Sequence, residues 1–436
     1  MRRRWGNSRE QERAILRSQP RIEEHLENLA SPRAVPRSET IQPFKMNEIK
    51  APEWPMYTEE EIQQVSDVLR SGRVNYWTGE NCRSFEREFA RKVGSLYAVA
   101  VSNGTVALEL ALRALNIGEG DEVVVSPRSF IASASCVVAV GATPVFADVD
   151  RDSGNLSARS IASVLSSRTK ACIVVHLAGW PAEMEEIMDL SREKGLFVIE
   201  DCAQAHGARY RGESVGAIGH IGAFSFCQDK IISTGGEGGM VVTDNEEVFN
   251  SVWSFKDHGK AFATVYRQDH PPGFRWLHES FGGNYRMTEV QAVIGRSQLG
   301  RLESMVERRG RFADMATKVL KQLDVVRLPK TPGHILHSYY RYYFYVEPSQ
   351  LRDGWSRDRI LDELNQKGCP GMSGSCSEIY LEKAFRDTPY GPKNGLPIAK
   401  ELGETSIMFP VFPEFDEEYV GRLLGNTVEI LGGATR

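Results

Sequence analysis

The stretch YAVAVSNGTVALELALRALNIGEGDEVVVS, residues 97–126, decides the fold. It begins and ends with short valine-rich runs of the kind that form buried β-strands. Between these runs, Leu108, Ala111, Leu112 and Leu115 recur at the spacing of one helical face. The stretch therefore predicts a strand, a helix with one face on a sheet, and a second strand.

The same alternation continues along the chain. Further strand-like runs are TPVFADV (143–149), ACIVVHL (171–177), LFVIED (196–201), IGAFSF (221–226) and GGMVVTD (238–244). Helical stretches separate most of them, which is typical of a parallel sheet covered by helices. The sequence predicts an α/β protein with a mostly parallel sheet of about seven strands and helices on both faces.

The C-terminal part of the chain has a different pattern. A charged helix is predicted from about Thr288 toward Arg309, leading out of the large domain. Beyond it, SYYRYYFYVEP (338–348) alternates like a strand, and FDEEYVGRLLGNTVEIL (415–431) is a closing amphipathic helix. We expect a large domain over residues 46–305 and a smaller C-terminal α+β domain over 306–436.

The opening 45 residues contain little that could join a core. They are rich in Arg and Glu and contain four prolines. We expect residues 1–45 to be a flexible extension. The alternative is a charged helix over residues 10–29 that contacts a partner.

Composition excludes several classes of protein. The net charge is −5, so nothing favours a nucleic-acid or anionic-membrane partner. The seven cysteines are odd in number, scattered and without metal-ligand spacing, which indicates a reduced, cytoplasmic chain and no metal site. The longest apolar runs are strand-sized, and the N-terminus lacks the apolar core of a signal peptide, so we expect neither a membrane span nor export.

Polar residues at strand ends are the first candidates for chemistry, because ligands of doubly wound sheets bind there. SNGT (102–105) follows the first strand and opens a helix, which places Gly104 and Thr105 where N–H groups and a hydroxyl could hold a phosphate. Taken alone, this motif is an ordinary helix cap. Asp201 ends the run LFVIED, where it would project from the sheet edge or cap the next helix.

Lys230 follows another strand, in FSFCQDK (224–230), and the glycine-rich turn STGGEGG (233–239) comes directly after it. Such a turn lets backbone approach a ligand or simply reverses the chain. An isolated lysine is most often a solvated surface residue. A pyridine cofactor, however, needs an amine to form a Schiff base and a carboxylate to keep its ring nitrogen protonated. Lys230 and Asp201 are of these two types.

The motifs occur in an order that resembles one protein family. SNGT is followed by SPRSF (126–130), EDCAQAHGA (200–208) and FSFCQDKIISTGGEGGMVVT (224–243), as in the DegT/DnrJ/EryC1/StrS aminotransferases, which have the pyridoxal phosphate (PLP) fold type I. HLAGWPAEM (176–184) also matches. The resemblance runs from about residue 46 to near the C-terminus and is densest between residues 79 and 295.

The resemblance implies roles for individual residues. Lys230 would be the Schiff-base lysine and Asp201 the partner of the pyridine nitrogen. The other implied cofactor contacts are Gly104, Thr105 and Ser225 to the phosphate, Gln204 to the ring hydroxyl, Phe130 on the ring face, and Asn284 to the phosphate of a neighbouring subunit.

These assignments have plainer alternatives. Phe130 could be a core aromatic, Ser225 could face solvent opposite its two phenylalanine neighbours, and Asn284 could stabilise its turn. We interpret His176 and His206 as structural histidines rather than acid–base groups.

The family implies ping-pong transfer of an amino group from glutamate or glutamine to a keto sugar, chiefly a nucleotide-linked 3- or 4-keto-deoxysugar, in a homodimer with its active site at the interface. Dehydratase relatives carry histidine in place of the lysine, so Lys230 favours transamination. An inosose aminotransferase and a non-catalytic PLP-binding regulatory relative remain as alternatives. Segments 371–385 and 406–416 depart from the usual pattern and weaken any inference about the sugar.

Overall fold

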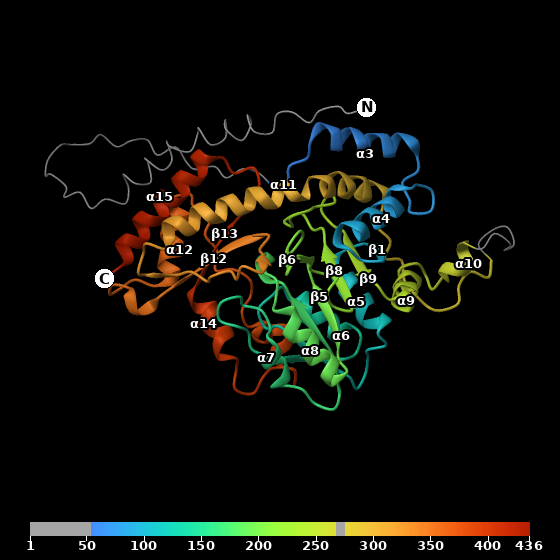
Figure 1. Cartoon of the computed structure of the whole chain (residues 1–436), viewed down its shortest axis with the longest axis horizontal. Coiled ribbons are helices and arrows are strands. Elements are labelled where there is room, and N and C mark those ends of the chain that lie inside the picture. The colour runs from blue at the N-terminus through green and yellow to red at the C-terminus, as the bar shows by residue number, and fades with distance from the viewer. Residues whose placement is uncertain (1–53, 267–274) are drawn as a thin grey trace, which may run out of the picture.

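The computed structural model describes residues 54–266 and 275–436, so the expectations for residues 1–45 lie outside the described residues. At its centre is a seven-stranded sheet in the order β1-β9-β8-β5-β4-β2-β3 (Figure 1). The strands are β1 (Tyr97–Val101), β2 (Glu122–Val125), β3 (Thr143–Phe146), β4 (Thr169–Val175), β5 (Phe197–Asp201), β8 (Ile221–Ser225) and β9 (Gly239–Thr243). All seven strand-like runs of the sequence form strands, which confirms the predicted α/β class.

One strand departs from the parallel arrangement. β9 pairs antiparallel with both β1 and β8, whereas the pairings β2–β3, β2–β4, β4–β5 and β5–β8 are parallel. β1 therefore points the same way as β2, β4, β5 and β8. The carboxyl ends of these strands lie at one edge of the sheet.

Helices cover both faces of this sheet, as predicted. On one face pack α5 (Gly104–Ala114), α6 (Ala132–Ala139) and α9 (Glu246–Lys256). On the other face pack α4 (Asn81–Val93), α7 (Ala158–Ala162), α8 (Met184–Lys194) and α11 (Glu289–Leu320). Successive strand residues alternate between the faces: Val99 and Val101 join the first core, Ala98 and Ala100 the second.

α5 shows how the sequence builds one unit of this fold. The Asn103 side chain caps its N-terminus by accepting a hydrogen bond from Val106 N at 2.9 Å. Leu108, Ala111 and Leu112 are buried on the sheet, as their spacing predicted. The cap fixes where the chain turns from β1 into the helix.

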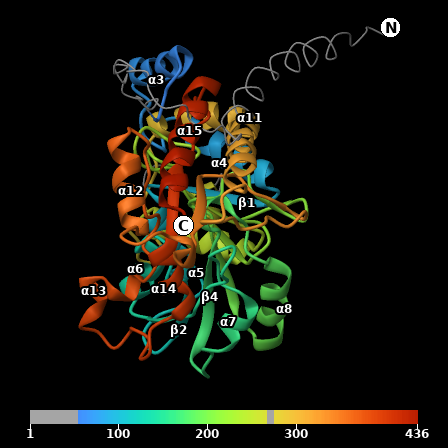
Figure 2. The same ribbon diagram turned by 90° about the vertical axis from the view of Figure 1, so that its left-hand side faces the viewer.

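A second sheet, in the order β10-β12-β13, is antiparallel and lies in the C-terminal part of the chain. It consists of β10 (Val326–Arg327), β12 (Arg341–Val346) and β13 (Ser406–Pro410), with α12 (Arg357–Gln366) and α15 (Glu417–Ala434) sharing its core. Figure 2 shows α12 and α15 side by side. The predicted tyrosine-rich strand and closing helix are β12 and α15.

The long helix α11 connects the two sheets. Thr288 caps it in a capping box with Gln291, and it continues to Leu320, eleven residues beyond the predicted end near Arg309. It contacts α3 (Glu59–Ser71) and α4 and also reaches α15 (Figure 1). α11 runs unbroken through residues 305 and 306, where the predicted boundary between the large and the small domain falls. The division of the chain into two domains at this point stays a prediction.

The remaining elements are short or peripheral. They are β6 (Arg209–Tyr210), β7 (Glu213–Ser214), β11 (Ile335–Leu336), α10 (Phe262–Tyr266), α13 (Lys383–Arg386), α14 (Pro397–Thr405), and the 3-10 helices η1 (Leu177–Gly179), η2 (Pro348–Gln350) and η3 (Ile379–Leu381). β11, β6 and β7 form a small third sheet. Within residues 54–266 and 275–436, no helix is both long enough and apolar enough to cross a bilayer.

Candidate active site

The carboxyl-end edge of the main sheet brings several predicted residues together. Ser225 is the last residue of β8, and Gly104 opens α5 just after β1. A Cβ atom at Gly104 would lie 2.6 Å from the Cβ of Ser225, so the close approach requires glycine. The result is a helix N-terminus, with its first backbone N–H groups beside a serine hydroxyl, which is suited to an anion. Thr105 follows with its side chain exposed.

The glycine-rich turn at residues 233–239 also lies against the N-terminus of α5. A Cβ atom at Gly239, where β9 begins, would lie 3.0 Å from the backbone nitrogen of Gly104. The turn therefore both reverses the chain and lets β9 run against the start of α5.

Asp201, the last residue of β5, is buried with only 5% of its surface exposed. Its Oδ2 accepts a hydrogen bond from Ser133 Oγ at 2.7 Å, and its Oδ1 accepts one from Ala203 N at 3.1 Å. Burial raises the pKa of Asp201, while these two bonds and the charge of Lys230 oppose the rise. A cationic ligand group beside Asp201 would relieve the cost of its buried charge.

Lys230 lies in the loop after β8, and its side chain is only 14% exposed, unlike a solvated surface lysine. Its Nζ lies 3.4 Å from Tyr340 Oη and 3.6 Å from Asp229 Oδ1. Burial lowers the pKa of Lys230, but Tyr340 and Asp229 raise it by more, so the net shift is upward. The loop is tied to α11, where Gln298 Oε1 accepts from Ser233 N at 2.9 Å.

The other three predicted residues differ in their surroundings. Gln204 Oε1 accepts from Ala178 N at 2.8 Å and so ties the loop after β5 to η1. Phe130 is 67% exposed, which contradicts the core alternative, and it lies three residues before Ser133. Asn284 is exposed, and its backbone pairs with that of Asp257 at the end of α9. In the described ranges, its side chain forms no hydrogen bond with the other predicted residues.

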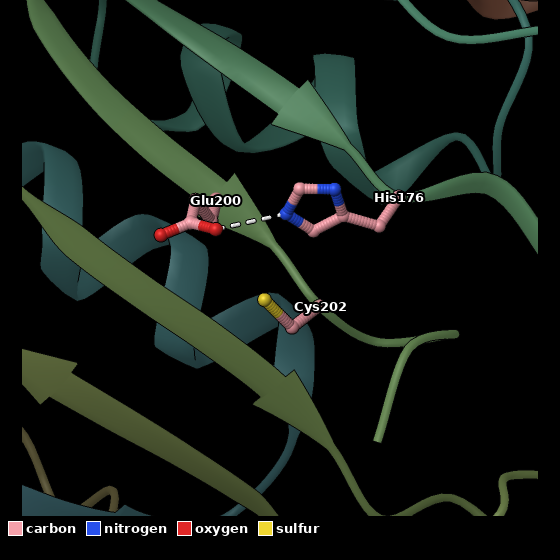
Figure 3. Close-up of side chains that lie close together, drawn as sticks. All are labelled: His176, Glu200 and Cys202. Atoms are coloured by element: carbon pink, nitrogen blue, oxygen red, sulfur yellow. Dashed lines mark hydrogen bonds and ion pairs between the residues drawn. The ribbon is translucent and has the colours of Figure 1, made fainter. Parts of the chain in front are cut away.

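Behind Asp201, three buried side chains lie close together: His176, Glu200 and Cys202 (Figure 3). Ala182 N donates to His176 Nδ1 at 3.0 Å, so the proton is on Nε2, which bonds Glu200 at 2.9 Å. Glu200 also accepts three backbone N–H groups, from Gly216, Ile218 and Gly219, at 2.6 to 2.9 Å. The His176, Glu200 and Cys202 ligand atoms lie close enough together to hold a metal ion, but hydrogen bonds already occupy both ring nitrogens of His176 and the carboxylate of Glu200. The structural role of His176 stays a prediction.

His206 is buried and packs against two aromatic rings. Its ring centroid lies 5.5 Å from that of Phe224 and 5.6 Å from that of Phe226. Burial, followed by the charges of Lys230 and Arg309, lowers the pKa of His206 to about 3. The ring is therefore neutral near neutral pH and carries no charge into the site.

Sequence reasoning missed three residues at this site. Ser133 bonds Asp201, and Tyr340 and Arg341 lie against the Lys230 loop. Ser133 had a weak signal, because it follows SPRSF closely on a helix. Tyr340 and Arg341 had none, because they are more than a hundred residues from Lys230 in an ordinary-looking strand.

The assembled groups fit pyridoxal phosphate. A buried lysine amine suits its aldehyde, and a buried carboxylate with a raised pKa suits its ring nitrogen. The glycine-lined start of α5 suits its phosphate, since a side chain at Gly104 would fill that cradle.

Comparisons with known proteins agree with this fit. The chain is 36% identical to GDP-perosamine synthase of Escherichia coli O157:H7, over 84% of this chain and 94% of that protein. It is also 36% identical to UDP-N-acetyl-3-dehydro-alpha-D-glucosamine 3-aminotransferase of Acidithiobacillus ferrooxidans, over 80% and 88%. The solved aminotransferase from Psychrobacter cryohalolentis is 52% identical, with a TM-score of 0.86 over 88% of this chain and 99% of that one.

A family-wide match covers most of the chain. The DegT/DnrJ/EryC1/StrS aminotransferase family matches residues 55–427, which include every predicted site residue. Solved chains of similar fold include DesV of S. venezuelae in complex with a ketimine intermediate, 32% identical with a TM-score of 0.76, and the PMP form of a Streptococcus pneumoniae chain, 25% identical with a TM-score of 0.78. The predicted PLP fold type I is confirmed. The chain therefore belongs to the DegT/DnrJ/EryC1/StrS aminotransferase family and is a PLP-dependent aminotransferase.

Proposed function

We propose that this aminotransferase moves an amino group from glutamate or glutamine to a keto sugar, in polysaccharide or natural-product biosynthesis. The acceptor is a nucleotide-linked 3- or 4-keto-deoxysugar. The observation that carries the proposal is the pair formed by the buried Asp201 carboxylate at the end of β5 and the Lys230 amine in the loop after the neighbouring parallel strand β8. The acceptor class is supported by the two relatives named above, one a perosamine synthase and the other an aminotransferase of a 3-dehydro sugar nucleotide.

In this proposal each predicted residue contacts a different part of the cofactor. Lys230 would hold it through its amine, and Asp201 would bond its ring nitrogen. The remaining contacts would be Gly104, Thr105 and Ser225 to the phosphate, Gln204 to the ring hydroxyl, and Phe130 on the ring face. When bound, the cofactor supplies a protonated pyridine ring that withdraws electrons and acidifies the Cα–H bond of the amino donor.

The chain's own groups then handle protons. Asp201, ionised beside the ring nitrogen, keeps that nitrogen protonated. The Lys230 amine, free once the donor amine has taken its place, removes the proton from the donor Cα. In the second half of the cycle it delivers a proton to the carbon that was the acceptor's carbonyl carbon. Lys230 is thus both general base and general acid.

We further propose a homodimer with its active site at the interface. Trp276 and Phe281 are 84% and 96% exposed on the segment that carries Asn284, and exposed large apolar side chains favour a protein contact. Asn284 would contact the phosphate held by the other subunit. Light scattering should show a dimer, and Phe281→Glu should give monomers that lack activity; a fully active monomer would contradict this arrangement.

The cytoplasmic location stays part of the proposal. All seven cysteines are free, and five of them are buried, which fits a reducing compartment.

The test incubates purified protein with glutamate and a panel of 3-keto and 4-keto sugar nucleotides, with 2-oxoglutarate and amino sugar measured by mass. We expect an amino sugar from at least one acceptor and no turnover by Lys230→Ala. Product from an inosose alone would overturn the nucleotide-sugar acceptor. A visible cofactor band that glutamate fails to bleach would indicate a non-catalytic relative.

A further inference from the structure

Tyr340, Asp229 and Arg341 form a polar group around the Lys230 amine. The roles proposed above assign no function to these three residues. Lys230 Nζ donates to Tyr340 Oη at 3.4 Å, and Tyr340 Oη in turn donates to Asp229 Oδ2. Arg341 Nη2 lies 3.2 Å from Tyr340 Oη and 3.4 Å from Asp229 Oδ2. The amine is therefore held by a residue that directly precedes β12 of the second sheet, while its own backbone lies in the loop after β8 of the first sheet.

The geometry of this group is fixed by packing. Tyr340 is 5% exposed, and the guanidinium carbon of Arg341 lies 4.1 Å from the centre of its ring. The indole Nε1 of Trp54 donates to the backbone oxygen of Lys230 at 3.1 Å, which fixes the lysine backbone. Both ends of the Lys230–Tyr340 contact are thus held in place.

The charges of the group are complementary. Burial raises the pKa of Asp229, but Lys230, Tyr340 and Arg341 lower it by more, so this carboxyl is ionised near neutral pH. Burial raises the pKa of Tyr340, so its hydroxyl is neutral. Because the Tyr340 proton is directed to Asp229, the tyrosine oxygen faces Lys230 as an acceptor. The ammonium form of Lys230, which its raised pKa favours near neutral pH, donates one N–H to Tyr340 and has two further N–H groups that can deliver a proton.

We propose that Tyr340 and Asp229 form a docking position for the Lys230 amine whenever that amine is not bonded to the cofactor, and that Arg341 holds the pair in place. This inference rests on the proposed function. It gives the amine a defined position and orientation between its two proton transfers. Tyr340, Asp229 and Arg341 are positioning residues, because they act through Lys230.

The first test uses the cofactor-free, full-length protein, so that it does not depend on turnover. Acetic anhydride labels lysine amines only when they are unprotonated, and the mass of the Lys230 peptide gives the labelling rate between pH 7 and 11. We expect Tyr340→Phe and Asp229→Asn each to lower the pKa of Lys230 and to raise its labelling rate at pH 8 by about 3- to 10-fold.

The matched control is Tyr342→Phe. Tyr342 lies on β12 with Tyr340 two residues away, but its hydroxyl lies 2.9 Å from Thr317 Oγ1 on α11 and does not contact Lys230. Its labelling profile should match that of the wild type. Circular dichroism and thermal melting show whether each variant is folded, and Asp229→Asn tests the same pair without altering the buried tyrosine.

The second test uses the loaded enzyme and glutamate deuterated at Cα. With Tyr340→Phe, the glutamate should lose its deuterium to solvent several-fold more slowly than with the wild type, and the dissociation constant of glutamate should be unchanged. Unchanged Lys230 labelling in both Tyr340→Phe and Asp229→Asn would overturn the docking position. If labelling changes but the wild type forms no 2-oxoglutarate, the docking position stands and the proposed function fails.

Discussion

The buried Asp201 carboxylate destabilises the folded protein when no cofactor is bound. An unfolded aspartate titrates near 3.9, and burial raises the pKa of Asp201 above that value. The folded chain therefore binds more protons than the unfolded chain between the two pKa values. The free energy of unfolding falls as the pH rises through that window, and the loss persists at higher pH. A protonated ring nitrogen next to Asp201 would reverse this cost.

This cost predicts opposite effects of Asp201→Asn on stability and on activity. The amide removes the buried charge, its oxygen can still accept from Ala203 N, and its NH2 group can donate to Ser133 Oγ in a reversed hydrogen bond. At pH 7 the cofactor-free variant should melt about 1–3 °C higher than the wild type. Its turnover should fall roughly a hundredfold or more, because the ring nitrogen loses its anionic partner. Calorimetry and the 2-oxoglutarate assay measure the two effects.

The control for this substitution is Asp189→Asn. The Asp189 side chain is 64% exposed and pairs with Arg192 at the surface, so the melting temperature and the turnover should stay close to wild type. A fully active Asp201→Asn enzyme would remove Asp201 from the proposed site.

At the scale of elements, α11 carries two glycines in contrasting surroundings. Gly295 is buried, and a Cβ atom there would lie 2.6 Å from Phe85 Cζ on α4. Gly300 is exposed, and a Cβ atom there would have no neighbour within 4 Å. The first glycine permits close packing of two helices, whereas the second only adds backbone freedom to the unfolded chain.

The same substitution at these two positions should therefore have effects of opposite sign. Gly300→Ala should raise the free energy of unfolding by about 0.5–1 kcal/mol. Gly295→Ala should lower it by about 1–3 kcal/mol, because Phe85 must move. Urea denaturation of both variants measures the difference. Equal effects would mean that α11 and α4 do not pack as closely as described.

At the scale of the whole molecule, two buried histidines make the fold sensitive to acid. Burial lowers the pKa of His206 and of His337 to about 3 in each case. Unfolded histidines take up protons near 6.5, so the unfolded chain binds more protons between pH 6.5 and 3. Stability is therefore full above pH 6.5 and is lost as the pH falls toward 3.

A single substitution tests the contribution of one of these histidines. His337→Gln removes the titrating group, while the glutamine oxygen can still accept the bond that His337 Nδ1 takes from Tyr339 N. Between pH 6 and 4, the free energy of unfolding should fall less steeply with acid than in the wild type, by up to about 1.4 kcal/mol per pH unit. Identical slopes would show that His337 is not buried in neutral form.

Local sequence pattern was enough to predict several parts of the molecule. The seven strands of the main sheet, β12 and the buried face of α5 could be predicted, because the spacing of apolar residues shows which side of an element meets the core. The lysine, the strand-end carboxylate and the glycine-rich turn were visible because their motifs are contiguous. The role of each residue could be inferred only from the family resemblance, because a contiguous motif does not show which distant residues contact it in the fold.

The tertiary structure alone decided what depends on contacts between distant residues. The antiparallel β9 is set by its pairing with β1 and β8, and α11 extends to Leu320 because Ala313, Ala316 and Leu320 pack into the core of the second sheet. The contacts of Ser133 with Asp201 and of Tyr340 with Lys230 join elements that no local pattern connects. Local periodicity specifies which residues are buried, whereas packing of the folded chain decides which of them meet.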